Sequence, residues 1–238
     1  MSDAMRMYVE VGFNVLYLIV VWTMNAIMSA RMRAVPQENR KLAGMFRWAF
    51  VLLALGDTGH VGFRVLAYAL GGLEQNSALL GAGALATAVT VTFFYGVMLY
   101  IWKERYHGKF GLLEYSLLAT IPVRLIVMAF PQNEWGASVP PVFWSLFRNL
   151  FLILLGVGVL YLYLRDSIRD HDRLFRWIGY CVLFSYLFYT PVILFSRDMP
   201  IIGMLMIPKT VMYVAIQFLA YFALWPRQTA LPSAASSD

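Results

Sequence analysis

The chain has 238 residues, of which 61% are hydrophobic and 13% are charged, and its formal net charge is +6. Because soluble domains carry about 25% charged residues, this composition excludes an ordinary soluble protein and predicts an integral membrane protein. The positive charge does not favour a nucleic-acid partner, since the Lys and Arg residues lie between apolar runs and do not interleave with aromatic residues on one soluble face.

Seven apolar segments are long enough to cross a hydrocarbon core about 30 Å thick, which takes about 20 helical residues. The connections between them are short, so the sequence predicts an all-α fold, a seven-transmembrane helix bundle whose sequential helices pack as antiparallel neighbours. We assign residues 1–226 to this single domain and residues 227–238 to a short disordered tail. The predicted helices cover residues 8–29, 44–70, 79–102, 111–130, 141–164, 174–196 and 200–225.

The Lys and Arg residues in the loops and at the adjoining helix ends fall mostly on one side of the membrane. Of the 19 in the chain, 13 lie in the segments after helices one, three, five and seven or at the helix ends beside them, Arg6 and Arg197 lie on the opposite side, and four lie deep inside helices. Since loops rich in Lys and Arg stay in the cytoplasm, this bias predicts an outside N-terminus and a cytoplasmic C-terminus. The 13 are Arg31, Arg33, Arg40, Lys41, Arg47, Lys103, Arg105, Lys109, Arg165, Arg169, Arg173, Arg176 and Arg227.

The first two predicted helices carry polar residues on one face. Glu10 and Asn14 are spaced i, i+4 on helix one, and the stretch GDTGHVGFR (56–64) interrupts helix two. An ionisable group in lipid costs several kcal/mol, so this stretch is expected to meet compensating partners inside the bundle. The polar stripe on helix two consists of Asp57, His60, Arg64 and Tyr68.

Four cations from four different helices are predicted to share one layer of the outer half of the membrane. At about 1.5 Å per residue, they lie about 9–14 Å below the outer helix ends. Those on helices four and seven have polar neighbours on their own face, at i, i+4 spacing, and the one on helix five stands beside Asn149. The four cations are Arg64, Arg124, Arg148 and Lys209, and the polar neighbours on helix seven are Tyr213 and Gln217.

Asp57 is the one acidic residue well inside the predicted helices, so pairing within the membrane leaves three of these cations without an acidic partner. The border acids Glu10, Glu134 and Asp198 could fold inward, which would make the network structural. Otherwise the site is suited to an anionic group such as phosphate or carboxylate, which arginine binds through two parallel hydrogen bonds. A single arginine could also extend outward to the lipid headgroups.

Asp57 and His60, spaced i, i+3, suit an acid–base pair or two metal ligands. The other histidines, His107 and His171, fall in turns across the membrane, so the sequence predicts no metal site and no cofactor. Most tryptophans, Trp135 among them, fall near predicted helix ends, which is typical of anchoring at the membrane interface.

Four segments together resemble a family of small bacterial seven-helix membrane proteins that has no established function. The similarity runs over most of the chain. It implies a location in the bacterial cytoplasmic (inner) membrane and implies no activity. The segments are GDTGHVGFR (56–64), TVTFFYGVMLYIW (90–102), FPQNEW (130–135) and IIGMLMIPKT (201–210).

Three functional hypotheses follow. The first is a transporter or receptor that binds an anionic small molecule or lipid headgroup in an outward-facing pocket. The second is an intramembrane enzyme that acts on a lipid headgroup, with Asp57 and His60 as acid and base. The third is a structural or assembly protein. Membrane lipids are the expected partners, and no protein partner is predicted. The ligand-binding residues of the first hypothesis are Arg64, Arg124, Arg148, Lys209, Tyr68, Asn14, Asn149, Tyr213 and Gln217.

Overall fold

Long apolar helices account for almost the whole fold. The computed structural model describes residues 3–197 and 199–226, and within them it contains seven α-helices, four short 3-10 turns and no strand. All seven helices are long and apolar enough to cross a membrane, which confirms the predicted all-α fold and indicates an integral membrane protein. The helices are α1 (Asp3–Ala30), α2 (Arg40–Ala69), α3 (Ser77–Tyr106), α4 (Leu112–Ala129), α5 (Val142–Arg169), α6 (Arg173–Phe195) and α7 (Met206–Leu224). The tail predicted over residues 227–238 lies outside the described residues.

Several helix ends differ from the predicted ones because hydropathy detects the hydrocarbon-spanning part of a helix and not its hydrogen-bonded length. Helices α3 and α5 continue four and five residues beyond their predicted ends, through polar residues that include Lys103 and Arg165. Helix α7 begins six residues late, because Pro200–Leu205 forms a 3-10 turn. Pro208 therefore lies in the first turn of α7, where a proline removes no intrahelical hydrogen bond.

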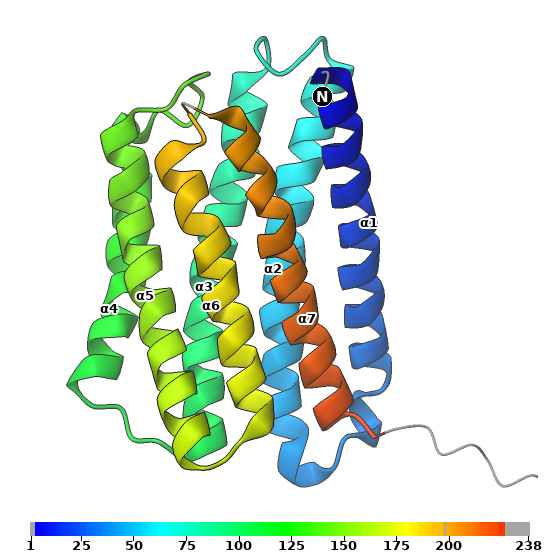
Figure 1. Ribbon diagram of the computed structural model, residues 1–238, viewed down its shortest axis with the longest axis vertical. Helices are drawn as coiled ribbons and strands as arrows, with labels where there is room; N and C mark the ends of the chain where they lie inside the picture. The colour runs from blue at the N-terminus through cyan, green and yellow to red at the C-terminus, as the bar shows by residue number, and fades with distance from the viewer. Residues whose placement is uncertain (1–2, 198, 227–238) are drawn as a thin grey trace, which may run out of the picture.

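The helices pack side by side in one bundle (Figure 1). Helix α2 packs most closely against α3; α1 packs on α2 and α7, whereas α4 packs on α3 and α5. The N-terminus and the end of α7 lie at opposite ends of the bundle. We call these the N-terminal end and the C-terminal end; which side of a membrane each end faces stays a prediction.

The solid part of the core lies toward the C-terminal end. The rings of Phe46, Phe94, Tyr163 and Phe175 are fully buried there. Phe175 contacts two of them, with ring centroids 6.2 Å from Phe46 and 5.1 Å from Tyr163. This aromatic core belongs to one half of the bundle, and the other half contains a cavity.

Candidate functional site

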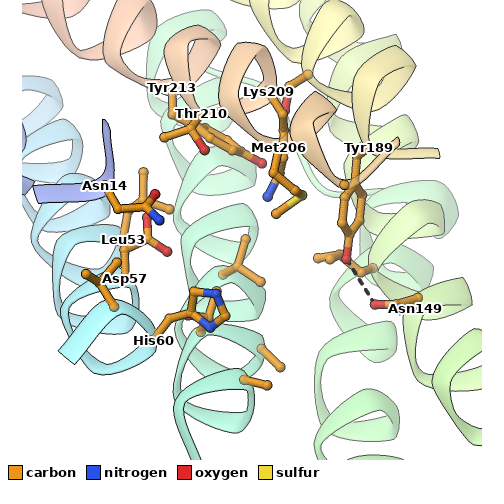
Figure 2. A pocket seen from close by; sticks show the side chains of 18 of the residues that line it. Asn14, Leu53, Asp57, His60, Asn149, Tyr189, Met206, Lys209, Thr210 and Tyr213 are labelled. Carbon is orange, nitrogen blue, oxygen red and sulfur yellow. Dashed lines mark hydrogen bonds between the residues drawn. The ribbon is translucent and has the colours of Figure 1, made fainter. Parts of the chain in front are cut away.

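A cavity of about 400 Å³ occupies the half of the bundle nearer the N-terminal end (Figure 2). Residues of all seven helices line it, and its volume falls within the range of about 300–1,000 Å³ that is typical of small-molecule sites. Its floor includes Tyr213, whose hydroxyl lies 2.9 Å from that of Tyr95 in the packed core. The cavity is therefore closed toward the C-terminal end by hydrogen-bonded tyrosines.

Two glycine contacts explain why the stretch 56–64 can present polar groups to this cavity. A Cβ atom on Gly56 would lie 1.8 Å from Oγ1 of Thr90, and one on Gly83 would lie 3.0 Å from Cα of His60. Small residues let membrane helices approach closely, so these glycines allow α2 and α3 to pack backbone to backbone. The close approach fixes the rotation of α2, and Asp57 and His60 line the cavity as a result.

The structure brings nine of the eleven predicted site residues together around the cavity. The two others do not line it. Tyr68 lies one residue before the end of α2. Gln217 is fully buried one turn beyond Tyr213, where its Nε2 atom donates to Oδ1 of Asn25 at 3.3 Å. The nine that line the cavity are Asn14, Asp57, His60, Arg64, Arg124, Arg148, Asn149, Lys209 and Tyr213.

Arg124 is held by neutral oxygen atoms of two other helices. Its Nε atom donates to the backbone carbonyl of Arg148 at 2.9 Å, and its Nη1 atom donates to the carbonyl of Ala88 at 2.8 Å and to the hydroxyl of Thr92. The residue is 2% exposed. In the described part of the chain its Nη2 amino group has no acceptor, so the guanidinium is fixed in orientation but keeps two N–H groups without a protein partner.

Arg148 is also held by neutral groups. Its Nη1 atom donates to Oδ1 of Asn133 at 3.1 Å, and its guanidinium carbon lies 4.2 Å from the ring centroid of Trp135. The Nε1 atom of Trp135 donates in turn to the carbonyl of Met128 at 3.0 Å. Trp135 is thus a wall of the cavity that stacks on a cation, and its interpretation as an interfacial anchor is incomplete.

Lys209 extends from α7 into the cavity, between the wall formed by α1 and α2 and the wall formed by α5 and α6 (Figure 2). Its Nζ atom lies 4.7 Å from the ring centroid of Tyr189 and 5.4 Å from that of Tyr213. The Asp57 carboxyl also attracts Lys209 electrostatically. The ammonium group has three N–H donors and no hydrogen-bond acceptor among the residues that the structure describes.

Asp57 and His60 lie on the wall formed by α1 and α2. The hydroxyl of Tyr17 donates to Oδ2 of Asp57 at 2.6 Å, which leaves Oδ1 without a donor among the residues that the structure describes. His60 forms no hydrogen bond with Asp57, although both line the cavity. The two side chains are therefore neighbours on one wall and not a hydrogen-bonded acid–base pair. Among the described residues, no three His, Cys, Asp or Glu side chains gather as a potential metal site.

The border acids were expected to decide the charge balance of the site. Glu134 is exposed at the loop after α4, with a left-handed backbone (φ 46°). The side chains of Glu10 and Asp198 lie outside the described residues. Within the described residues, no carboxylate lies at ion-pair distance from Arg124, Arg148 or Lys209, and Asp57 is the one acidic side chain that lines the cavity.

Three residues that complete the site were not predicted from the sequence. Tyr17 binds Asp57, Tyr189 donates to Oδ1 of Asn149 at 3.3 Å, and Trp135 stacks on Arg148. Tyr17 follows Asn14 by three positions on α1, and this i, i+3 spacing would have predicted that both face the cavity. The other two depend on contacts between distant parts of the chain.

Comparison of the chain with protein-family models, with curated proteins and with solved structures yields no match. Membership of the bacterial seven-helix family stays a prediction, and the function must be argued from the cavity itself.

Proposed function

We propose that this protein binds an anionic ligand in the cavity, and that it acts as a transporter or receptor for a small molecule or lipid headgroup bearing phosphate or carboxylate. One observation carries the proposal. Arg124, Arg148 and Lys209 line one cavity, and in the described part of the chain their hydrogen-bond and cation–π partners are all neutral. Asp57, which attracts Lys209 electrostatically, is the one acidic side chain among the described residues that line the cavity.

The charge of these three cations favours a bound anion more than their hydrogen bonding does. Carbonyl oxygens and aromatic rings satisfy part of each cation, but they do not neutralise it, and a charge removed from water without a counter-ion costs several kcal/mol. An anion in the cavity would interact with all three cations at low dielectric, where attraction is stronger than in water. It would also accept hydrogen bonds from Arg124 Nη2 and Lys209 Nζ, which have no protein acceptor among the described residues.

The distribution of Lys and Arg supports a membrane orientation for this proposal. The loops at the C-terminal end are the basic ones, so the positive-inside tendency favours a cytoplasmic C-terminal end. The cavity would then lie in the outer half of the bacterial cytoplasmic membrane. Its closed tyrosine floor would separate a bound ligand from the cytoplasm.

The enzyme hypothesis has less support. A general acid–base pair needs its two groups within hydrogen-bond reach of each other or of one substrate proton, and Asp57 bonds to Tyr17 instead of His60. The cavity would still serve an enzyme if a substrate bridged the two residues, so turnover of a bound lipid is an additional assay and not the first one.

Native mass spectrometry of the protein, gently extracted from its host membrane, tests the proposal. The variant is Lys209→Met, which removes the charge and leaves no protein acceptor unsatisfied. The matched control is Lys103→Met, since the Nζ atom of Lys103 lies 4.4 Å from the ring centroid of Phe110, outside the cavity, at the far end of α3. We expect an anionic adduct on the wild type and on Lys103→Met that Lys209→Met loses. No anionic adduct on any of the three, together with no rise in melting temperature on adding phosphate or acetate, would overturn the proposal.

A further inference from the structure

We infer that the ligand of this cavity is zwitterionic, with an ammonium group that binds at Asp57 and a phosphate or carboxylate group that binds at Arg124 and Lys209. This inference rests on the proposed function and narrows it. The chemical class is an amino-alkyl phosphate or an amino-alkyl carboxylate, either free or as the headgroup of a lipid.

The acidic side chain that lines the cavity stands on a different wall from Arg124 and Arg148, and Arg64 stands two turns from it on α2. Asp57 stands on α2 beside residues of α1, whereas Arg124 and Arg148 stand on α4 and α5. Helix α1 packs on α2 and α7, and α4 packs on α3 and α5, so the two sets belong to opposite sides of the bundle (Figure 1). In Figure 2, Asp57 and Asn14 face Asn149 and Tyr189 across the cavity, with Lys209 between them. The site therefore has an acidic pole and a basic pole.

The acidic pole is the carboxylate of Asp57, which can accept further hydrogen bonds. A carboxylate has about four acceptor positions, and in the described structure Asp57 receives one strong hydrogen bond, from the hydroxyl of Tyr17 at 2.6 Å. That hydroxyl also fixes the carboxylate in place. The remaining oxygen and the side chain of Asn14 line the same part of the cavity, where a ligand ammonium group with three N–H donors would be satisfied.

Three cations of the cavity leave this acceptor without a hydrogen bond. Within the described structure, neither Lys209 nor Arg124 nor Arg148 forms an ion pair with Asp57, although all four residues line one cavity and the carboxylate attracts Lys209 electrostatically. A ligand that was only anionic would neutralise the basic pole but would be repelled by the carboxylate and would leave its free oxygen unsatisfied. A ligand with both charges satisfies both poles.

Binding of matched ligand pairs to the full chain in an uncharged maltoside detergent tests the inference. The pairs differ only in the ammonium group: ethyl phosphate against phosphoethanolamine, and propionate against β-alanine. A third pair, phosphatidylethanol against phosphatidylethanolamine in mixed micelles, distinguishes a lipid headgroup from a free ligand. Affinity is read from the ligand dependence of the melting temperature, since a ligand that binds only the folded state stabilises it according to its concentration and Kd.

In the wild type we expect the ammonium-bearing member of at least one pair to bind about tenfold more tightly or better, which corresponds to about 1.4 kcal/mol. In Asp57→Asn the preference should fall to near one, while the affinity for the simple anion is kept or increases. Asp166→Asn, a matched change at a buried carboxylate near the C-terminal end, should keep the preference.

Equal affinity within every pair that binds would overturn the zwitterion inference and leave the proposed anion site intact. A preference that persists in Asp57→Asn would do the same. If no member of any pair binds the wild type, the proposed function fails as well. The wild-type comparison alone is decisive even if Asp57→Asn does not fold.

Discussion

Lys209→Met should stabilise the ligand-free protein, although it removes a residue from the centre of the site. A lysine inside a membrane helix costs about 2.5–3.5 kcal/mol on insertion scales. Two cation–π contacts, with Tyr189 and Tyr213, return about 0.5–1 kcal/mol each. Attraction to the Asp57 carboxyl lowers the cost further, so we expect a net gain of about 1 kcal/mol from the substitution. Methionine keeps the length and apolar volume of the side chain, and no protein acceptor loses a donor.

The single cysteine of the chain provides the assay. Cys181 is half-buried on α6, so a thiol-reactive fluorogenic dye labels it when the bundle unfolds on heating. In a chain of this size, about 1 kcal/mol corresponds to about 2–4 °C. We expect the Lys209→Met midpoint to rise by this amount without ligand, and to be insensitive to anions that raise the wild-type midpoint. Lys209→Arg, which keeps the charge, should respond to anions as the wild type does.

A fall in the midpoint of Lys209→Met, with no anion response in the wild type, would refute this reasoning. It would mean that the ammonium group is a structural partner in the folded protein, as the structural hypothesis requires.

Four further substitutions, of which Gly62→Ala is a control, test the framework of the site by the same unfolding assay. Gly56→Ala should lower the melting midpoint, because the new Cβ atom would meet Thr90 and overpacking costs about 1–3 kcal/mol. Gly62→Ala should leave the midpoint unchanged or raise it slightly, because no atom lies within 4 Å of the new Cβ atom. Asn133→Ala removes a fully buried amide that donates to two backbone carbonyls and accepts from a guanidinium, so we expect a loss of about 1–3 kcal/mol and a weaker anion response. Asp166→Asn weakens an acceptor that binds three side chains, so it should lower the midpoint and keep the anion response. A lost anion response would contradict the view that the ion pairs at the C-terminal end are independent of the cavity.

The helices could be predicted from the sequence because membrane spans are set by a local property, the length of an apolar run. Their ends could not, since hydrogen bonding continues past the apolar part in α3 and α5 and begins late in α7, after a 3-10 turn. The termini of a helix depend on capping and on the loops, which hydropathy does not report.

The faces of the site could also be predicted in part. The i, i+4 spacing placed Lys209 and Tyr213 on one face of α7, and both line the cavity. The same spacing extended the face to Gln217, which lies in the packed core, because periodicity gives the direction of a side chain and not the depth at which a cavity ends. The partners of Arg124 could not be predicted at all, since two of them are backbone carbonyls on other helices.

The bundle has a packed half and a half that contains the cavity, and this division explains how the charges of Arg124, Arg148 and Lys209 are tolerated. Near the C-terminal end, the fully buried rings of Phe46, Tyr163 and Phe175 belong to a core that spans α2, α3, α5 and α6, and none of the three lines the cavity. The other half can then hold three cations with neutral partners at a cost that the packed half offsets. A bundle that used the charges around its cavity for stability would pair them with carboxylates, as Asp166 pairs with Arg165 and Arg169 near the C-terminal end of α5. The cations around the cavity have neutral hydrogen-bond partners in the described structure, and this contrast supports the proposal that they bind a ligand.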